Sequence, residues 1–245
     1  MKISIIIATL NNQETIERNL TSIEAQTYNN YEIIIIDGGS KDNTLEIAKK
    51  FNFKNIKFKN QVSKGVYGAF NEGIKLSIGE IIIILNADDF FSDKQSLKII
   101  SDEFQKDENL SLLMSNVKII NKQNKVKRIY KSSNFKNYMF YFGHMPAHTG
   151  IFVKKEVYEN YGYFIENFNN AGDFEFLVRV LFKKKIKFKK IDDYLVKMLY
   201  GGKSNKSFQS FVINTIEIKK ALKLNGFFSS YFLIMIRFVI KIFQF

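Results

Sequence analysis

Two adjacent carboxylates, Asp88 and Asp89, follow the apolar run 81–85 after only Asn86 and Ala87. Neighbouring negative charges repel each other, and a bound cation that they share with other anions offsets this repulsion. Because the chain has no cysteine and only two histidines, we expect a cation that prefers oxygen ligands, Mg²⁺ or Mn²⁺. Such ions use one or two protein carboxylates, and substrate phosphates complete the shell. The alternative is a turn whose aspartate caps the helix that begins near residues 93–95.

A third carboxylate, Asp37, follows the apolar run 31–36 and precedes Gly38 and Gly39. An acid at the end of a strand can bind a ribose hydroxyl or a base edge of a nucleotide. An Asp-Gly-Gly turn needs no ligand, however, and on these residues alone the turn is the simpler interpretation.

The elements that must position these acids alternate between strand and helix over the first 90 residues. Apolar runs predict four buried strands, at residues 3–10, 31–36, 56–58 and 81–85. Apolar residues at helical spacing predict helices between them, around residues 16–23, 45–51 and 69–74. Ser40 is the expected N-cap of the second helix. The alternation predicts βαβ units and a parallel sheet with right-handed crossovers.

Polar residues stand at the carboxyl ends of three of these strands: Thr9, Asp37 and Asn86 with its two aspartates. Ligands of such sheets bind beyond the carboxyl ends of the strands, so these groups mark the expected site. No G-x-G-x-x-G sequence accompanies them, which disfavours a dinucleotide site of the usual kind.

The second half of the chain is less regular. Strands are expected at residues 110–120, 125–130 and 150–153, with an extended segment at 187–199, and helices at 171–182 and 207–224. The simplest division is one domain over residues 1–206 and a C-terminal helical extension over 207–245.

The composition narrows the class of partner. Lys and Arg number 37 against 24 Asp and Glu, a formal net charge of +13. That excess indicates an anionic partner such as a phosphorylated substrate, anionic lipid or nucleic acid. The absence of cysteine excludes disulfides, zinc fingers, iron–sulfur clusters and thiol catalysis. Met1-Lys2 leads directly into an apolar strand with no cleavage-site pattern, so a cytoplasmic location is expected.

Three stretches of the sequence, taken together and in order, resemble a known enzyme family. They are SIIIATLNNQETIERNLTSIEAQTYNNYEIIIIDGGSKDNTLEIAKKF (4–51), SKGVYGAFNEGIKLSIGEIIIILNADDFF (63–91) and, more loosely, HTGIFVKKEVYENYGYFIENFNNAGDFEFLVRVL (148–181). Covering nearly half the chain, they resemble family 2 glycosyltransferases of the GT-A fold. The resemblance implies an α/β, Rossmann-like fold with a mixed, mainly parallel sheet flanked by helices. It also implies a nucleotide-diphosphate-sugar donor, with a UDP-linked hexose or N-acetylhexosamine as the expectation.

The resemblance also implies roles for residues on the donor side. Thr9 and Asp37 match positions that contact the nucleoside, and Lys64 and Gly65 match the loop that runs beside the donor.

Other matching positions concern the metal and the chemistry. Asn86 and Asp88 stand at the two ends of the family's D-x-D motif, so Asp88 is the leading ligand for Mn²⁺ or Mg²⁺, with Asp89 beside it. Asp173 matches the general base of inverting members, although it also precedes a helix and can cap it. His148 matches a position near the acceptor or the diphosphate, and a structural histidine is the alternative.

The sequence departs from the family pattern in three respects. Asn86 replaces the first Asp of D-x-D, and Gly68 stands where relatives with this loop usually carry an acid. The Q-x-x-R-W motif of processive synthases is absent, so addition of a single sugar is expected.

Glu175, two residues beyond Asp173, is a minor alternative base.

The tail FFSSYFLIMIRFVIKIFQF (227–245) is almost wholly apolar apart from Arg237 and Lys241. It is too short and too interrupted to predict a spanning helix. An amphipathic helix at the membrane interface is the preferred interpretation, with Arg237 and Lys241 reaching anionic headgroups. The alternative is a helix packed on the domain. The preferred interpretation predicts a peripheral location at the inner face of the cell membrane.

The sequence therefore predicts an inverting glycosyltransferase that adds one sugar to a glycan or lipid-linked acceptor in surface-polysaccharide or lipopolysaccharide assembly. A nucleotidyltransferase is one alternative, but it needs a basic, Gly-rich phosphate loop near the N-terminus, which ATLNNQET lacks. A non-enzymatic protein that binds membranes or nucleic acid is another, but it leaves the acids at the strand ends unexplained. No nucleic-acid partner is expected, and the sequence does not indicate an oligomeric state.

Overall fold

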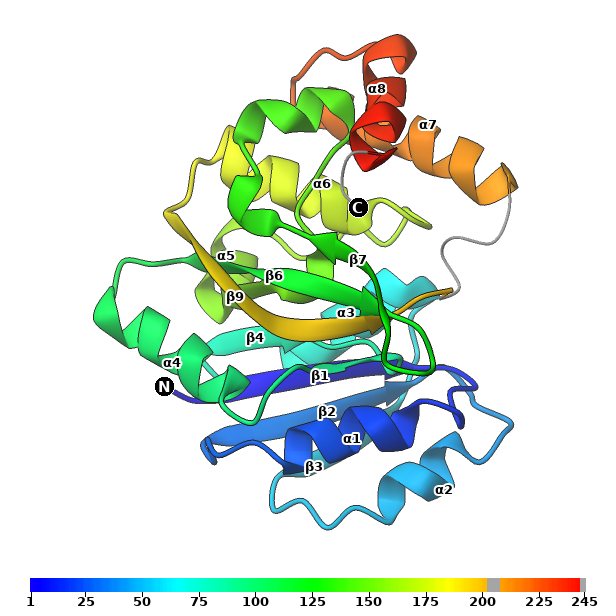
Figure 1. Cartoon of the computed structure of the whole chain (residues 1–245), viewed down its shortest axis with the longest axis vertical. Coiled ribbons are helices and arrows are strands. Elements are labelled where there is room, and N and C mark those ends of the chain that lie inside the picture. The colour runs from blue at the N-terminus through cyan, green and yellow to red at the C-terminus, as the bar shows by residue number, and fades with distance from the viewer. Residues whose placement is uncertain (202–207, 243–245) are drawn as a thin grey trace.

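A single mixed sheet forms the centre of the molecule (Figure 1). This computed structural model describes residues 1–201 and 208–242. The strands of the described part are β1 (Ile3–Thr9), β2 (Tyr31–Asp37), β3 (Ile56–Asn60), β4 (Ile81–Ile84), β5 (Asp89–Phe91), β6 (Leu112–Ile120), β7 (Val126–Tyr130), β8 (Ile151–Lys154) and β9 (Phe188–Leu199). Their order across the sheet is β3-β2-β1-β4-β8-β6-β9-β5, and β7 pairs with β6. The mixed α/β sheet expected from the sequence is confirmed.

The first four strands form a parallel block. β1 pairs in parallel with both β2 and β4, and β2 pairs in parallel with β3. In this register Thr9 lies opposite Asp37, and Asp37 lies opposite Asn60. The polar residues at the ends of the strands therefore reach the same edge of the sheet.

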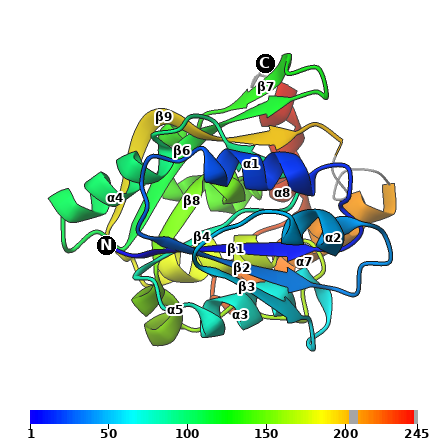
Figure 2. The ribbon, with the colours of Figure 1, turned by 90° about the horizontal axis from the view of Figure 1, so that it is seen from below.

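Helices cover both faces of the parallel block (Figure 2). On one face lie α1 (Ile16–Glu24) and α2 (Thr44–Lys49), and α4 (Ser96–Lys106) continues the same core. On the other face lie α3 (Gly65–Leu76) and α5 (Lys155–Tyr161). Alternate residues of β1 serve the two sides, because side chains of a strand point to opposite faces. Ile5 packs with α1, whereas Ile6 belongs to the core under α3.

The second half of the sheet runs in mixed directions. β8 is antiparallel to both β4 and β6, β9 is parallel to β6, and β5 is antiparallel to β9. Three 3₁₀ segments, Ser132–Asn134, Asn137–Phe142 and His148–Gly150, connect β7 to β8. Helix α6 (Gly172–Leu177) continues into a π-helical turn, Val178–Lys183, so the helix predicted at 171–182 changes type part-way.

The C-terminal helices α7 (Phe208–Leu224) and α8 (Tyr231–Ile242) lie at the opposite end of the molecule from α2 (Figure 1). Ile218, Leu222 and Ile234 belong to the same core cluster as Phe174 of α6. The described part of the tail is therefore packed on the domain. The predicted division between residues 206 and 207 lies outside the described residues and stays a prediction.

Two local predictions were wrong. Ser40 does not cap the second helix: α2 begins at Thr44 after Asn43, and the Ser40 hydroxyl donates a hydrogen bond of 2.6 Å to Asp37 instead. Arg237 does not extend outward from α8, because its side chain is only 4% exposed. The side chain of Lys241 lies outside the described residues.

Candidate active site

A cavity of about 820 Å³ opens at the carboxyl ends of β1 and β4. Its volume falls in the range of about 300 to 1,000 Å³ that small-molecule sites occupy. Eight of the nine residues predicted for the site line it: Thr9, Lys64, Gly65, Asn86, Asp88, Asp89, His148 and Asp173. The cavity therefore lies where a ligand of a doubly wound sheet is expected.

Asp37 is the predicted residue that does not line this cavity. Its Oδ2 accepts hydrogen bonds of 3.0 Å from the backbone N–H groups of Gly39 and Ser40, and its Oδ1 accepts one from the Ser40 hydroxyl. These bonds close the Asp-Gly-Gly turn, and Gly39 adopts φ +91 there. The turn interpretation accounts for Asp37, while contact with a nucleoside stays a prediction.

Glu72 on α3 holds the loop that carries Lys64. Its Oε1 accepts hydrogen bonds from the backbone N–H groups of Val62 (2.9 Å) and Ser63 (2.7 Å) and from the Ser63 hydroxyl (2.5 Å). Its Oε2 lies 2.8 Å from Nζ of Lys59. Burial raises the pKa of Glu72, but these partners outweigh it and lower the pKa to about 2. The loop is thus tied to the helix through one carboxylate.

Gly68 leaves the space that this arrangement needs. A Cβ at Gly68 would come within 2.5 Å of the Ser63 Oγ. Gly68 and Glu72 are one helical turn apart on α3 and therefore share a face.

The segment between β4 and β5 forms a tight turn. The backbone N–H of Asp89 donates to the carbonyl of Asn86 at 2.9 Å. The side-chain amide of Asn19 on α1 donates to the backbone carbonyls of both Asn86 and Asp89, at 2.9 and 2.7 Å. This turn directs Asp88 to the cavity and places Asp89, only 2% exposed, on a short strand that the sequence did not predict.

The amide of Asn86 joins the aspartate pair to His148. Its Nδ2 donates to Oδ2 of Asp89 at 3.1 Å and lies 2.9 Å from Nε2 of His148. With an amide donor facing Nε2, neutral His148 carries its proton on Nδ1. That Nδ1 lies 3.8 Å from Oδ2 of Asp173.

Asp173, at the start of α6, lines the same cavity as this turn. Its Oδ1 accepts hydrogen bonds from the phenol of Tyr67 at 3.1 Å and from the backbone N–H of Phe174 at 2.8 Å. Burial raises the pKa of Tyr67 far above its ordinary value, and the charge of Asp173 raises it further. Tyr67 is therefore a permanent hydrogen-bond donor to Asp173. No pattern in the sequence singles out this tyrosine.

Glu175 does not reach the site. It is 1% exposed, and its two oxygens accept bonds of 3.0 and 2.9 Å from the guanidinium of Arg179, with a further bond of 3.1 Å from the Asn225 amide. It lines neither described cavity. The minor interpretation of Glu175 as an alternative base is therefore wrong.

The model of glycosyl transferase family 2 matches residues 4–162. The chain belongs to glycosyl transferase family 2. Poly-beta-1,6-N-acetyl-D-glucosamine synthase of Staphylococcus epidermidis is 38% identical to this family 2 member over 130 residues. The match covers 52% of this chain and 31% of that protein's length. Family membership removes the support for a nucleotidyltransferase or a non-enzymatic binding protein.

Solved structures support the same fold for this family 2 chain. S. aureus TarS 1-349 in complex with UDP-GlcNAc superimposes with a TM-score of 0.70 and 19% identity, covering 91% of this chain and 66% of that one. Mannosyltransferase PcManGT from Pyrobaculum calidifontis, in complex with GDP-Man and Mn²⁺, superimposes with a TM-score of 0.65 and 16% identity, covering 89% and 64%. The GT-A fold predicted from the sequence is confirmed.

The donor set between β4 and β5 suits a hard divalent cation. Burial raises the pKa of Asp89 well above its usual range, and the charge of Asp88 raises it further, against a lowering by the Asn86 amide. A cation beside these oxygens would relieve that repulsion. Within the described ranges no three acidic or histidine side chains form a ready-made cage. One or two carboxylates are nevertheless sufficient for Mg²⁺ or Mn²⁺ bound together with a diphosphate.

Proposed function

We propose that this chain transfers one sugar from a nucleotide-diphosphate sugar to a hydroxyl of a glycan or lipid-linked acceptor, with inversion at the anomeric carbon. The observation that carries the proposal is a single cavity lined by Asp88, Asp89 and Asp173. The two groups of acids serve opposite ends of the breaking bond. Similarity to a poly-N-acetylglucosamine synthase favours a UDP-linked N-acetylhexosamine as donor.

In this proposal the donor lies along the strand ends. Thr9 and the turn closed by Asp37 face the nucleoside, and the loop of Lys64 and Gly65 runs beside the phosphates. Gly65 adopts φ +74, a conformation that glycine accepts without strain. Asp88, with Asp89 behind it, would hold Mn²⁺ or Mg²⁺, which when bound supplies positive charge to the departing diphosphate.

Asp173 acts as the general base. Its carboxylate takes the proton of the acceptor hydroxyl while that oxygen bonds to the anomeric carbon and the bond from this carbon to the diphosphate oxygen breaks. The nucleoside diphosphate leaves with the bonding electrons, so one displacement inverts the centre. Tyr67 fixes Oδ1 of Asp173, which leaves Oδ2 as the oxygen available to the acceptor.

The test measures transfer and hydrolysis of UDP-N-acetylglucosamine and of a panel of other sugar nucleotides. We expect Asp173→Asn to lower kcat by about 10² to 10⁴, the usual contribution of general base catalysis. The exposed Asp193→Asn is the matched control and should leave kcat unchanged. Asp88→Ala should abolish activation by Mn²⁺. Full activity of Asp173→Asn would reject the assignment of Asp173 as the base. Unchanged Mn²⁺ activation in Asp88→Ala would reject the assignment of Asp88 as a metal ligand.

We also propose contact with an anionic membrane surface at the cytoplasmic face, where a lipid-linked acceptor of surface-polysaccharide or lipopolysaccharide assembly would be presented. Phe228 is 83% exposed and Phe232 is 78% exposed, and Tyr231 and Met235 are exposed beside them. Nζ of Lys219 lies 3.9 Å from the centroid of the Tyr231 ring. Exposed aromatic groups beside lysines are typical of interfacial helices. None of the described helices has the length and hydrophobicity to cross a bilayer.

Vesicle sedimentation tests this contact. Binding to phosphatidylglycerol vesicles should exceed binding to phosphatidylcholine vesicles and should weaken at high salt. The double variant Phe228→Ser/Phe232→Ser should bind several-fold more weakly, whereas Ile78→Ser, which removes an exposed apolar side chain elsewhere, should bind like the wild type. Equal binding by all three proteins would reject the membrane contact.

A further inference from the structure

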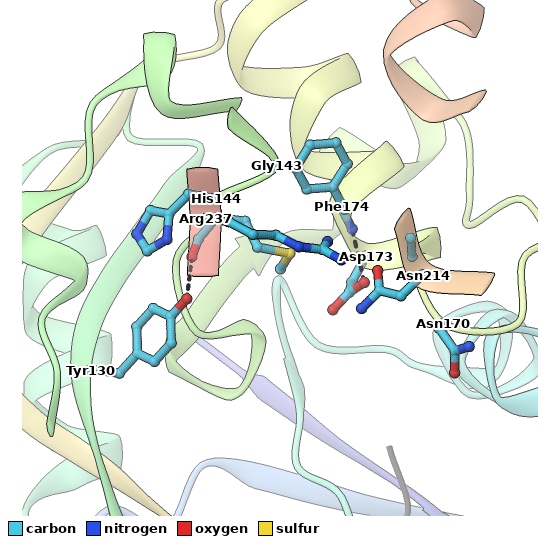
Figure 3. A pocket seen from close by; sticks show the side chains of 10 residues that line it. Tyr130, Gly143, His144, Asn170, Asp173, Phe174, Asn214 and Arg237 are labelled. Atoms are coloured by element: carbon cyan, nitrogen blue, oxygen red, sulfur yellow. Dashed lines mark hydrogen bonds between the residues drawn. The ribbon is translucent and has the colours of Figure 1, made fainter. Parts of the chain in front are cut away.

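A second, smaller cavity adjoins the proposed reaction centre (Figure 3). Its volume is about 130 Å³, and it shares Asp173 and Asn170 with the large cavity. Tyr130 of β7, Asn214 of α7 and Arg237 of α8 form much of its remaining wall. Such a space is smaller than a complete ligand site and suits one functional group of a larger molecule.

Arg237 is held in place at this cavity. Its Nη2 donates a hydrogen bond of 2.7 Å to Oγ1 of Thr215, and its guanidinium lies 5.8 Å from the centroid of the Phe211 ring. Figure 3 shows its side chain running across the cavity toward Asp173 and Asn214. Burial lowers the pKa of Arg237 to about 10, so the side chain stays charged at neutral pH.

The polar groups of the wall suit an oxygen-rich anion. A guanidinium presents several N–H donors in one plane and matches the oxygens of phosphate or carboxylate. The amides of Asn170 and Asn214 add neutral donors to the same wall. Among the described residues that line the cavity, Asp173 is the sole carboxylate.

We propose that this cavity binds an anionic group of the acceptor, a phosphate or a carboxylate, through Arg237, and that the acceptor hydroxyl thereby reaches Asp173. The inference rests on the proposed glycosyl transfer. Through Arg237, the packed helix α8 then has a role in the choice of acceptor. Asn214 and Arg237 lie beyond residues 4–162, the stretch that the family model matches.

Isothermal titration calorimetry of the full chain tests the site, with inorganic phosphate and glucuronate as separate probes. Arg237→Gln should weaken the affinity at least about tenfold, as expected for loss of a charge-assisted hydrogen bond. Arg237→Lys should weaken it less. Lys94→Gln, which changes an exposed lysine that lines neither cavity, should leave this binding unchanged. Binding that survives Arg237→Gln, or that weakens as much in Lys94→Gln, would overturn the proposal, as would no binding by the wild type.

A second variant keeps the test decisive if Arg237→Gln does not fold, which circular dichroism will reveal. Asn214→Asp adds a negative charge to the wall and should also weaken anion binding, so an unchanged affinity overturns the site. Tighter binding of phosphate indicates a phosphate-bearing acceptor, and tighter binding of glucuronate indicates a uronic acid. Arg237-dependent binding in a chain that transfers no sugar would retain the anion site and reject the proposed function. Sugar transfer by a chain that shows no Arg237-dependent anion binding would retain the proposed function and reject the anion site.

Discussion

The side-chain amide of Asn86 lies 2.9 Å from Nε2 of His148, and the two residues are 62 positions apart in the sequence. The same amide donates to Asp89. An ionised aspartate at position 86 could donate to neither group. The residue that departs from D-x-D therefore acts as a hydrogen-bond donor that orients the histidine and one aspartate.

Asn86→Asp should strengthen metal binding and destabilise the metal-free protein. The change replaces a donor with a third carboxylate close to Asp89, and like charges at such distances disfavour ionisation of one another. We expect a loss of about 1 to 2 kcal/mol without metal and half-maximal activation at a lower Mn²⁺ concentration. Thermal unfolding without metal measures the stability, and an Mn²⁺ titration of the transfer rate measures the activation. Asn86→Ala, which removes the donor without adding charge, is the control; identical Mn²⁺ responses in Asn86→Asp and the wild type would contradict the prediction.

Tyr67→Phe should lower kcat while leaving the donor KM nearly unchanged. The substitution keeps the buried ring and removes only the phenol that donates to Asp173. A lost hydrogen bond to a charged group is worth about 1.5 to 3 kcal/mol, so we expect kcat to fall about tenfold to a hundredfold. Steady-state kinetics provides the measurement. Tyr158→Phe alters another buried tyrosine that lines neither cavity, and it should retain full kcat. Equal kcat values for both variants would remove Tyr67 from the mechanism.

Much of the fold and of the site could be predicted from the sequence. Runs of isoleucine fix the parallel strands, and parallel strands bring Thr9 and Asn86 to one edge whatever the loops between them do. Tyr67 could not be found in this way, because it meets Asp173 only after α3 and α6 have packed. The prediction that Arg237 reaches outward to headgroups was wrong for a similar reason. An amphipathic helix has the same sequence pattern whether its apolar face meets lipid or protein.

The bonds of Glu72 should make stability depend on pH in the acid range. Its pKa falls from an ordinary value of 4.5 to about 2 on folding. The resulting stabilisation is present above pH 4.5 and is lost as the pH falls toward 2. After allowance for the exposure of Lys59, we expect it to be worth about 1 to 2 kcal/mol. The free energies of urea unfolding of Glu72→Gln and of the wild type should differ by this amount at pH 6, and the difference should shrink steadily as the pH falls from 4.5 toward 2. A constant difference across this range would disprove the ion-pair explanation.

Gly68→Ala tests the same loop from the opposite side. The added Cβ would press on the Ser63 Oγ, so either Ser63 or the helix must move. Overpacking of this kind typically destabilises a protein by about 1 to 3 kcal/mol. Because Lys64 is next in the chain, we also expect a higher donor KM, with kcat less affected. Ser133→Ala, on a distant segment, is the control. Gly201→Ala is not suitable, because Gly201 has a φ of +96, a conformation that strains an alanine. An unchanged donor KM in Gly68→Ala would separate the loop from donor binding.

Glu175→Gln should impair folding and spare chemistry, the opposite of Asp173→Asn. The Glu175 carboxylate pairs with Arg179, whose guanidinium also donates to the backbone carbonyls of Tyr161, Gly162 and Tyr163. Breaking a buried ion pair leaves an uncompensated charge and costs about 3 to 5 kcal/mol, although these carbonyls will retain part of the solvation of Arg179. We therefore expect a loss of about 2 to 3 kcal/mol in urea unfolding, with kcat of the folded fraction within about twofold of the wild type. A kcat that falls as far in Glu175→Gln as in Asp173→Asn, with stability unchanged, would restore Glu175 as a base.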